Sequence, residues 1–438
     1  MISFTPSQKN AVERTKGDVF VSAAAGSGKT AVLVERIVNI ITNQNEKVEA
    51  DSILVVTFTK AAASELSAKI KRRLEQQLKE NPSDSWLKRQ MNLIKQANIS
   101  TIHSFCMSLI KEYWNRVDIP RDFTIIDEFS LADLKEVALT RAGQILYSNE
   151  YDFSTYSDLF GRARSDSDAL KTIDQFMRFS TDIANLKEWS ERFLIQQEKQ
   201  GCINQSYTGK LMLSYVAKTV EAAAEMMTIA FEIIQKDEKL QSAYSNAFTE
   251  DNRVIYELKG AVEEADWDGC INILERYKPL SLGNSKGSDP ILRESAKGLR
   301  DRVKKILSSD IKRKYLPITE EEFKQDSHIN SFAFTKLLVA YEIYSKELDK
   351  LKYQHRSYEY SDLERYTIEL LETDSTIRKE INSRYTHILV DEYQDTNEVQ
   401  EKLLKLLKGE KTALFAVGDV KQSIYGFRRA DPEIFINA

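Results

Sequence analysis

The stretch 19–30 constrains this chain most, because it joins an apolar run to a glycine-rich loop and a helix. Its sequence is VFVSAAAGSGKT, and segment 31–38 after it has the apolar spacing of a helix. A strand, a loop of small residues and a helix in this order form a phosphate-binding unit, in which backbone N–H groups surround phosphate oxygens. Ala23 replaces the first glycine of the usual G-x-x-x-x-G-K-S/T pattern. The alternative is a glycine-rich turn with an incidental lysine.

The side chains around this loop suit a nucleotide and a metal ion. Lys29 can reach the β- and γ-phosphates of ATP, and the Thr30 hydroxyl can ligate Mg²⁺. Upstream, Thr5 and Pro6 begin a helix. The amide of Gln8 on this helix can pair with adenine, although a surface glutamine is the common alternative. The other residues expected to hold ATP are Ala23, Ala24, Ala25, Gly26, Ser27 and Gly28.

The composition is that of an ordinary globular chain and excludes several classes of protein. A length of 438 residues suggests two or three domains. There is no apolar run of about 18 residues that could span a membrane, and the N-terminus does not resemble a signal peptide. Cys106, Cys202 and Cys270 are far apart, so we expect free thiols in a reducing compartment and a cytoplasmic location. The net charge of −5 does not by itself indicate a nucleic-acid partner.

Two blocks with alternating strands and helices flank a helical block. Short apolar runs typical of buried strands occur in 1–129 and again in 356–438, whereas helical periodicity dominates 130–355. The simplest arrangement is an α/β fold, in which both outer blocks build one parallel sheet with helices on both faces. The middle block is then a large inserted all-helical domain.

Polar and aromatic side chains stand at the end of two strands of the first block. In parallel sheets this edge binds ligands. Hydroxyl groups there can contact phosphates, and Phe58 can stack on a base. His103 has no metal-ligand partner at a suitable spacing, so a hydrogen bond to a phosphate or to the backbone is expected. The alternative is core packing for Phe58 and helix capping for Thr59. The set is Thr57, Phe58, Thr59, Thr101, His103 and Ser104.

The second block supplies the carboxylates that a phosphate loop needs. Asp391 and Glu392 end an apolar strand, so Asp391 is expected to hold Mg²⁺ and Glu392 to act as the base for the attacking water. Two exposed acids that cap a helix are the alternative. Gln422 follows the next strand and can sense the γ-phosphate. Beyond it, Tyr425 and Phe427 can stack on bases, and Arg428 can bind phosphate; core packing of the two aromatics is the alternative.

The segment 286–314 is strongly basic. It contains ten basic residues and only four acidic ones. Such a stretch can bind duplex DNA, or it can simply form a solvated helix face.

Taken together, these segments resemble the N-terminal part of the superfamily 1 helicases of the UvrD/Rep type. They follow the order of the family's motifs, which makes the resemblance specific for the two outer blocks. The fold that it implies is RecA-like. The matching segments are 4–8 (Q motif), 23–30 (motif I), 56–62 (motif Ia), 101–105 (the Thr-x-His-Ser motif), 389–395 (motif II) and 417–428 (motif III).

Within that family, segments 23–36 and 418–432 are most similar to the AddA (RexA) group of helicase–nuclease proteins. The resemblance implies an ATP-dependent DNA helicase with Mg²⁺ as cofactor, which moves along single-stranded DNA in the 3′ to 5′ direction. It also implies contact with duplex DNA, a role in double-strand break repair and recombination, and a partner subunit of the AddB/RexB type. Because no long apolar run is present, no contact with a membrane is expected.

The sequence ends at Ala438, directly after motif III. We therefore expect the second RecA-like domain and the nuclease domain of that group to be absent. Activity should then be weak or missing, since an arginine from the second domain can be worth about 10³–10⁵ in rate. Two other interpretations stay open: a non-hydrolysing DNA-end-binding or scaffold module of a larger repair complex, and an unrelated phosphate-loop enzyme such as a kinase.

Overall fold

The computed structural model of the chain contains two compact units. It describes residues 4–43, 45–148, 151, 153–160, 167–199, 203–423, 426 and 430–437. The sheet unit consists of residues 1–186 and 337–438, and the helical unit consists of residues 187–336.

A five-stranded parallel sheet forms the centre of the sheet unit. Every described pairing is parallel, for example Val21 beside Val417, and Val390 beside Ala416. Because parallel strands all end at one edge, the residues that follow them come together there. The α/β class with a parallel sheet is thereby confirmed. The order across the sheet is β1 (Val19–Ser22), β7 (Ala413–Gly418), β6 (His387–Val390), β2 (Ile53–Thr57) and β3 (Asn98–Thr101).

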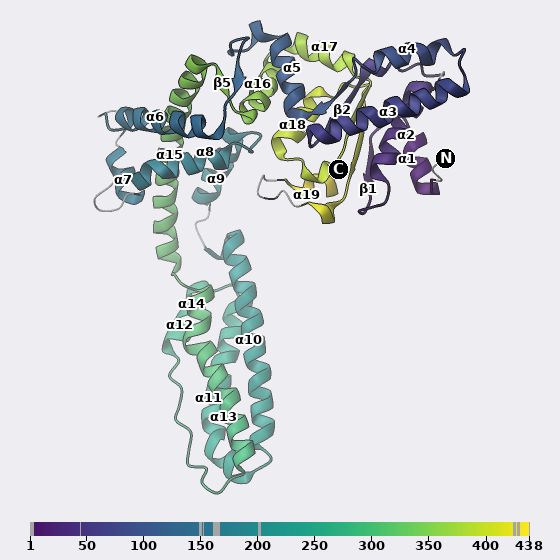
Figure 1. Ribbon diagram of the computed structural model, residues 1–438. Coiled ribbons are helices and arrows are strands. Elements are labelled where there is room, and N and C mark those ends of the chain that lie inside the picture. The colour runs from purple at the N-terminus through teal and green to yellow at the C-terminus, as the bar shows by residue number, and fades with distance from the viewer. Residues whose placement is uncertain are drawn as a thin grey trace. The chain divides into compact units, whose positions relative to one another are not determined.

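Helices cover both faces of this sheet (Figure 1). Alternate residues of β2 serve the two faces: Leu54 and Val56 belong to one buried core, Ile53 and Val55 to the other. The core of Ile53 and Val55 is closed by α1 (Pro6–Glu13), α2 (Lys29–Thr42), α3 (Lys60–Glu80) and α4 (Ser85–Leu93). The other core is closed by α5 (Ile102–Glu112), α16 (Tyr360–Thr373), α17 (Ser375–Arg384) and α18 (Glu398–Leu407).

A second group of helices in the sheet unit packs around the C-terminal half of α15 (Glu320–His355). On α15, Tyr341 packs edge-on against Phe176 and the Tyr344 hydroxyl donates to Asp174 Oδ1 at 3.1 Å. These contacts hold 130–186 and 337–355 within the sheet unit, although the sequence analysis assigned both segments to a helical domain of 130–355. The elements are α6 (Glu128–Leu146), α7 (Phe153–Phe160), α8 (Ser167–Ser180) and the two-stranded sheet of β4 (Thr124–Ile125) and β5 (Ser357–Tyr358).

The helical unit is built on long helices with one apolar core. Its described residues from 203 to 336 form helices and connecting loops without a strand. The Trp267 indole is buried in this core and donates to Ile318 O at 2.8 Å. The elements are α9 (Leu186–Lys199), α10 (Tyr207–Ile234), α11 (Glu238–Glu263), α12 (Trp267–Arg276), α13 (Pro290–Lys305), the π-helix η4 (Ile306–Asp310), α14 (Ile311–Tyr315) and the first half of α15.

Part of the basic stretch 286–314 has a structural role. Arg300 is buried and its Nε donates to Asp251 Oδ2 at 2.6 Å, while Tyr277 donates to the other oxygen of that carboxylate at 2.8 Å. Lys312 pairs with Glu275. The exposed cations of the stretch are Lys286, Lys297, Arg302, Lys305, Arg313 and Lys314.

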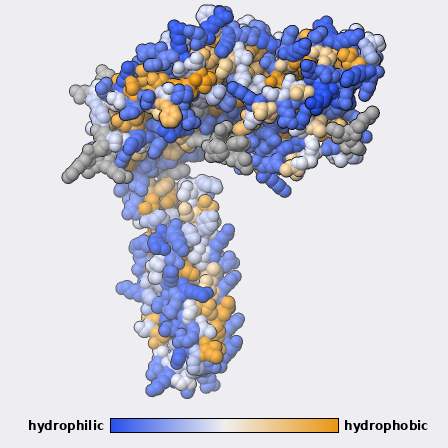
Figure 2. Space-filling view, in the orientation of Figure 1, coloured by the Kyte–Doolittle hydropathy of each residue, from blue (hydrophilic) through white to orange (hydrophobic). Residues whose placement is uncertain are grey.

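The described residues have a mostly hydrophilic surface and buried free thiols, as the composition predicts. Hydrophilic residues cover most of the visible face of each unit, with hydrophobic residues in small groups (Figure 2). Within the described ranges, no helix has the length and apolarity needed to cross a membrane. Cys106 and Cys270 are buried free thiols, as expected, and Cys202 lies outside the described residues.

The buried pair of Asp251 and Arg300 should be important for the stability of the helical unit. Asp251→Ala leaves the Arg300 guanidinium buried without its carboxylate, so we expect the free energy of unfolding to fall by about 3–5 kcal/mol. Denaturant titration of the chain, followed by circular dichroism, measures this change. Arg253→Ala is the control, because Arg253 pairs with Glu250 on the exposed side of the same helix and should change nothing measurable. Equal effects of the two variants would contradict the assignment.

Candidate functional site

The loop between β1 and α2 has the backbone of an anion cradle. The Ala23 amide donates to Gly418 O at 2.9 Å, which continues the pairing of β1 with β7. Gly26 and Gly28 have φ values of 73° and 83°, in the left-handed region that favours glycine. Gly28 caps α2, so Lys29 and Thr30 stand in the first turn of that helix. Amide groups of such a first turn lack helical partners and can bind phosphate oxygens.

Lys29 brings three predicted residues together at this loop. Its side chain is only 10% exposed, and its Nζ lies 3.2 Å from Glu392 Oε2. The same Nζ donates to Gln422 Oε1 at 2.9 Å. Gln422 ends the single turn η6 (Val420–Gln422), which directly follows β7. The cation therefore bridges the ends of β6 and β7 from its position after β1.

Gln8 lies beside the same loop, with both ends of its amide engaged. Its Oε1 accepts from the Thr5 amide at 2.7 Å in a capping box at the start of α1. Its Nε2 donates to Ser27 O at 2.8 Å. The sequence analysis did not predict the bond to Ser27.

The carboxylates that follow β6 are held in a strained turn. The Asp391 amide donates to Val56 O at 3.0 Å, so the pairing of β6 with β2 continues through Asp391. Glu392 has a φ of 51°, a left-handed value that is costly for a residue with a side chain and often marks a functional site. Burial, and then the charge of Glu392, raise the pKa of Asp391.

Asp395 is a third carboxyl group near this turn. It is 8% exposed, and burial, followed by the charge of Glu392, raises its pKa to about 6. Its Oδ1 has no hydrogen-bond partner among the described groups. Carboxyl groups disfavoured in this way gain from a nearby cation. Because Thr30 and Asp391 provide only oxygen ligands, this donor set fits Mg²⁺.

A cavity of about 510 Å³ joins the carboxylates to four of the six described residues that were predicted to bind DNA. Thr57 and Phe58 line it after β2, Thr101 and His103 line it from β3 and α5, and Asp391 and Glu392 line it after β6.

Two predicted residues, Thr59 and Ser104, are not among those that line the cavity. The Thr59 hydroxyl oxygen accepts from the Ala62 amide at 3.1 Å and caps α3. In α5 the cap is Thr101: its Oγ1 accepts from the Ser104 backbone amide at 3.3 Å and lies 2.9 Å from Ser104 Oγ. The capping alternative is thus observed for Thr59.

His103 has neighbours that the sequence analysis missed. Its Nε2 lies 3.2 Å from Glu364 Oε1, and its ring lies 4.9 Å from the ring of Tyr360. Gln400 donates to the same Glu364 oxygen at 3.0 Å. Tyr360, Glu364 and Gln400 all line the cavity. The sequence shows that histidine is rare, but no local pattern links His103 to Glu364. Their contact could therefore not be predicted from the sequence.

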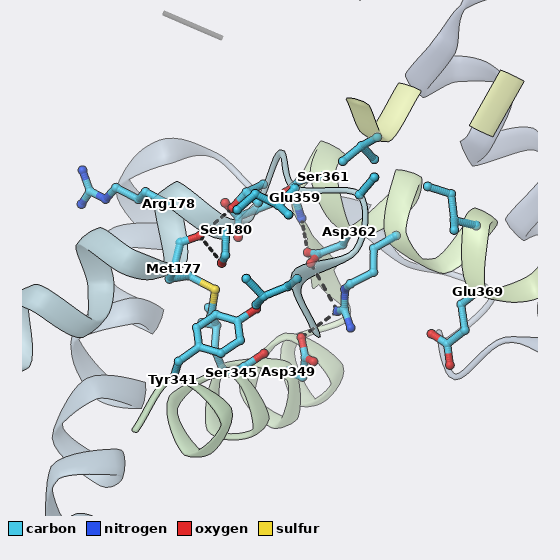
Figure 3. A pocket seen from close by; sticks show the side chains of 18 of the residues that line it. Met177, Arg178, Ser180, Tyr341, Ser345, Asp349, Glu359, Ser361, Asp362 and Glu369 are labelled. Carbon is cyan, nitrogen blue, oxygen red and sulfur yellow. Dashed lines mark hydrogen bonds and ion pairs between the residues drawn. The ribbon is translucent and has the colours of Figure 1, made fainter. Parts of the chain in front are cut away.

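A second cavity, of about 340 Å³, shows how α16 is anchored (Figure 3). Lys352 is 3% exposed, and its Nζ donates at 2.7 Å to both Glu359 Oε2 and Asp362 Oδ2. Burial lowers the pKa of Lys352, but the two carboxylates outweigh burial and raise it overall. Arg365 donates to Asp349 at 2.9 Å. These bonds tie the first turn of α16, which carries Tyr360, to α15.

The remaining predicted DNA-binding residues lie outside the described residues. These are Tyr425, Phe427 and Arg428.

Comparison with known proteins agrees with the motif order. The model of the UvrD/REP helicase N-terminal domain matches residues 4–438. Proteins named as the A-type subunit of an ATP-dependent helicase/nuclease are 34% identical in Anoxybacillus flavithermus, 30% in Natranaerobius thermophilus and 32% in Lachnoclostridium phytofermentans, over 99% of this chain in each case. The chain covers 37%, 35% and 33% of those relatives, about a third of their length. The resemblance predicted from the motifs is confirmed, and the chain belongs to the family of the UvrD/REP helicase N-terminal domain.

Proposed function

We propose that this chain is the ATP-binding and hydrolysing part of a DNA helicase motor. The observation that carries the proposal is the position of Lys29, whose Nζ contacts both Glu392 and Gln422 at the end of the phosphate loop. A lysine held between a carboxylate and an amide can exchange them for the oxygens of a γ-phosphate. Glu392 and Gln422 are then released beside that phosphate, where the base and the sensor are needed.

Each residue of the site has a role in this proposal. The loop 23–28 and Lys29 bind the phosphates. Thr30 and Asp391 hold Mg²⁺, which neutralises charge that develops on the phosphate oxygens. Glu392 orients and deprotonates the attacking water. Gln8 reads adenine, and the bond from its Nε2 to Ser27 O keeps its amide beside the loop.

Single-stranded DNA is the proposed occupant of the 510 Å³ cavity. Phe58 offers a ring for base stacking, while Thr57, Thr101 and His103 offer polar groups for phosphates. Thr59, Ser104, Tyr425, Phe427 and Arg428 complete the proposed set. Asp391 and Glu392 line this cavity as well as the proposed nucleotide site. A change at this turn can therefore be felt by both the nucleotide and the DNA. ATP turnover then drives translocation, in the 3′ to 5′ direction by family resemblance.

The relatives, which are named as helicase/nuclease proteins, suggest the larger setting. We propose that 1–129 and 356–438 form a RecA-like domain, interrupted by the helical insertion 130–355, of which 130–186 and 337–355 belong to the sheet unit. The exposed cations of segment 286–314 in this insertion are proposed to bind duplex DNA. A protein of the AddB/RexB type is the proposed partner, in double-strand break repair. A chain that binds DNA ends without hydrolysing ATP is the alternative, which turnover measurements separate from the first.

ATP turnover should depend on Lys29 and Glu392 in different ways. Glu392→Gln should keep ATP binding but lower DNA-stimulated turnover by about 10²–10⁴-fold, because the base is lost. Lys29→Ala should weaken binding itself. Steady-state hydrolysis and nucleotide titration, with and without single-stranded DNA, measure both. Lys408→Ala is the control, since Lys408 pairs with Asp18 just before β1, at the other edge of the sheet. Turnover that survives Glu392→Gln would contradict the proposal.

Affinity for single-stranded DNA should depend on Phe58. Loss of a stacking ring costs about 1–3 kcal/mol per base, so Phe58→Ala should weaken binding of an oligonucleotide about 5- to 150-fold. Fluorescence anisotropy with a labelled oligonucleotide measures this. The matched control is Phe129→Ala, because Phe129 is 87% exposed at the start of α6 and does not line the cavity. Equal affinity of the two variants would rule out the proposed groove.

A further inference from the structure

Gln394 is a buried glutamine that bonds to two separate parts of the site. It lies in the single turn η5 (Tyr393–Asp395) and is 1% exposed. Its Nε2 donates to Glu392 Oε2 at 2.8 Å, and its Oε1 accepts from the Asp419 amide at 2.8 Å. Its backbone oxygen accepts from Ser423 Oγ at 3.3 Å. One side chain therefore joins the proposed base to the chain that follows β7.

These bonds close a ring of contacts around the phosphate position. The backbone N–H of Gln422 donates to the backbone oxygen of Asp419 at 2.8 Å, and this bond forms the turn η6. Gln422 Oε1 accepts from Lys29, and Lys29 returns to Glu392. Gln394 is the link between the carboxylate and the turn. An amide suits this place because it donates and accepts at the same time, which a carboxylate or an apolar side chain cannot do.

Gly418 shows how closely Gln394 approaches the end of β7. A Cβ added at Gly418 would lie 2.3 Å from Gln394 Oε1 and 3.1 Å from the Gln394 amide nitrogen. A larger residue must therefore displace the Gln394 side-chain oxygen from the Asp419 amide, and it also crowds the backbone of η5. Close approach of two backbones is what calls for glycine here.

We infer that Gln394 is a positioning residue, which holds Glu392 and the Gln422 turn as one unit. This inference rests on the proposed ATP hydrolysis. A shift of Gln422 toward a γ-phosphate is passed through Asp419 and Gln394 to Glu392. The base is thereby aligned when the phosphate is present.

Two substitutions of Gln394 separate its two bonds. Gln394→Glu keeps an oxygen for the Asp419 amide but loses the N–H to Glu392, whereas Gln394→Met loses both. Gln394→Glu should bind ATP normally and hydrolyse it about 100-fold more slowly at about pH 8. Relative to wild type, its rate should partly recover toward about pH 6, because burial beside two carboxyl groups favours the protonated form of the introduced carboxyl group, which donates again. Among the described residues, the titratable groups in contact with this side chain are Glu392 and Asp395, and Lys29 contacts the same Glu392 oxygen.

Hydrogen exchange tests the other bond without any need for turnover. The Asp419 amide should exchange at least about tenfold faster in Gln394→Met but within about threefold of wild type in Gln394→Glu. Gly418→Ala should raise exchange and lower turnover although Gln394 is unchanged. The matched control is Gln90→Glu: Gln90 is buried in α4, and its Oε1 accepts from the Ala50 amide at 2.8 Å. Its Nε2 has no partner among the described groups.

The outcomes are distinct for the inference and for the proposed function. The inference would be overturned if Gln394→Glu hydrolysed ATP within about threefold of the wild-type rate at about pH 8. It would also be overturned if the Asp419 amide of Gln394→Met exchanged as slowly as in wild type. A loss of turnover in Gln90→Glu equal to that in Gln394→Glu would assign the effect to folding and overturn it too. Wild-type chain without ATP turnover would count against the proposed function, and the exchange comparison would still decide whether Gln394 links the two segments.

Discussion

Lys29 contacts both Glu392 and Gln422, although Glu392 lies 363 positions and Gln422 lies 393 positions further along the chain. These contacts exist because β1 pairs with β7 and β7 pairs with β6, all in parallel. Parallel pairing brings the ends of these strands to one edge, and the cores on both faces fix that pairing. The proposed base and sensor lie within reach of one lysine only while this arrangement holds.

Much of this edge could be predicted from local sequence. Short apolar runs that end in polar residues identified the strands, and the glycine-rich loop before Lys29 identified the start of α2. Such patterns are local, since a strand and its end are read from a few neighbouring residues. The order of the motifs then restricted which strand ends could meet. For this reason Thr57, His103 and Glu392, which line one cavity, could be predicted as site residues from the sequence.

The supporting residues could not be predicted in the same way. Glu364 reaches His103 from α16, and Gln394 reaches Asp419 across two strand ends, so both depend on packing between distant segments. Arg300 looked like part of a solvated basic face, yet it is buried against Asp251. The strain at Glu392 is also invisible in sequence, because glutamate rarely adopts a φ of 51°. Tertiary context decided each of these features.

The most direct test is a crystal structure of this chain with Mg²⁺ and a non-hydrolysable ATP analogue. The account predicts that the Lys29 ammonium group moves from Glu392 and Gln422 to phosphate oxygens. Thr30 and Asp391 should then lie around the metal ion, and Glu392 should face the γ-phosphate. The central claim is that Glu392 and Gln422 bind Lys29 where the γ-phosphate oxygens bind it in the nucleotide complex. A nucleotide bound elsewhere, or one bound here with Lys29 still on Glu392, would contradict this claim.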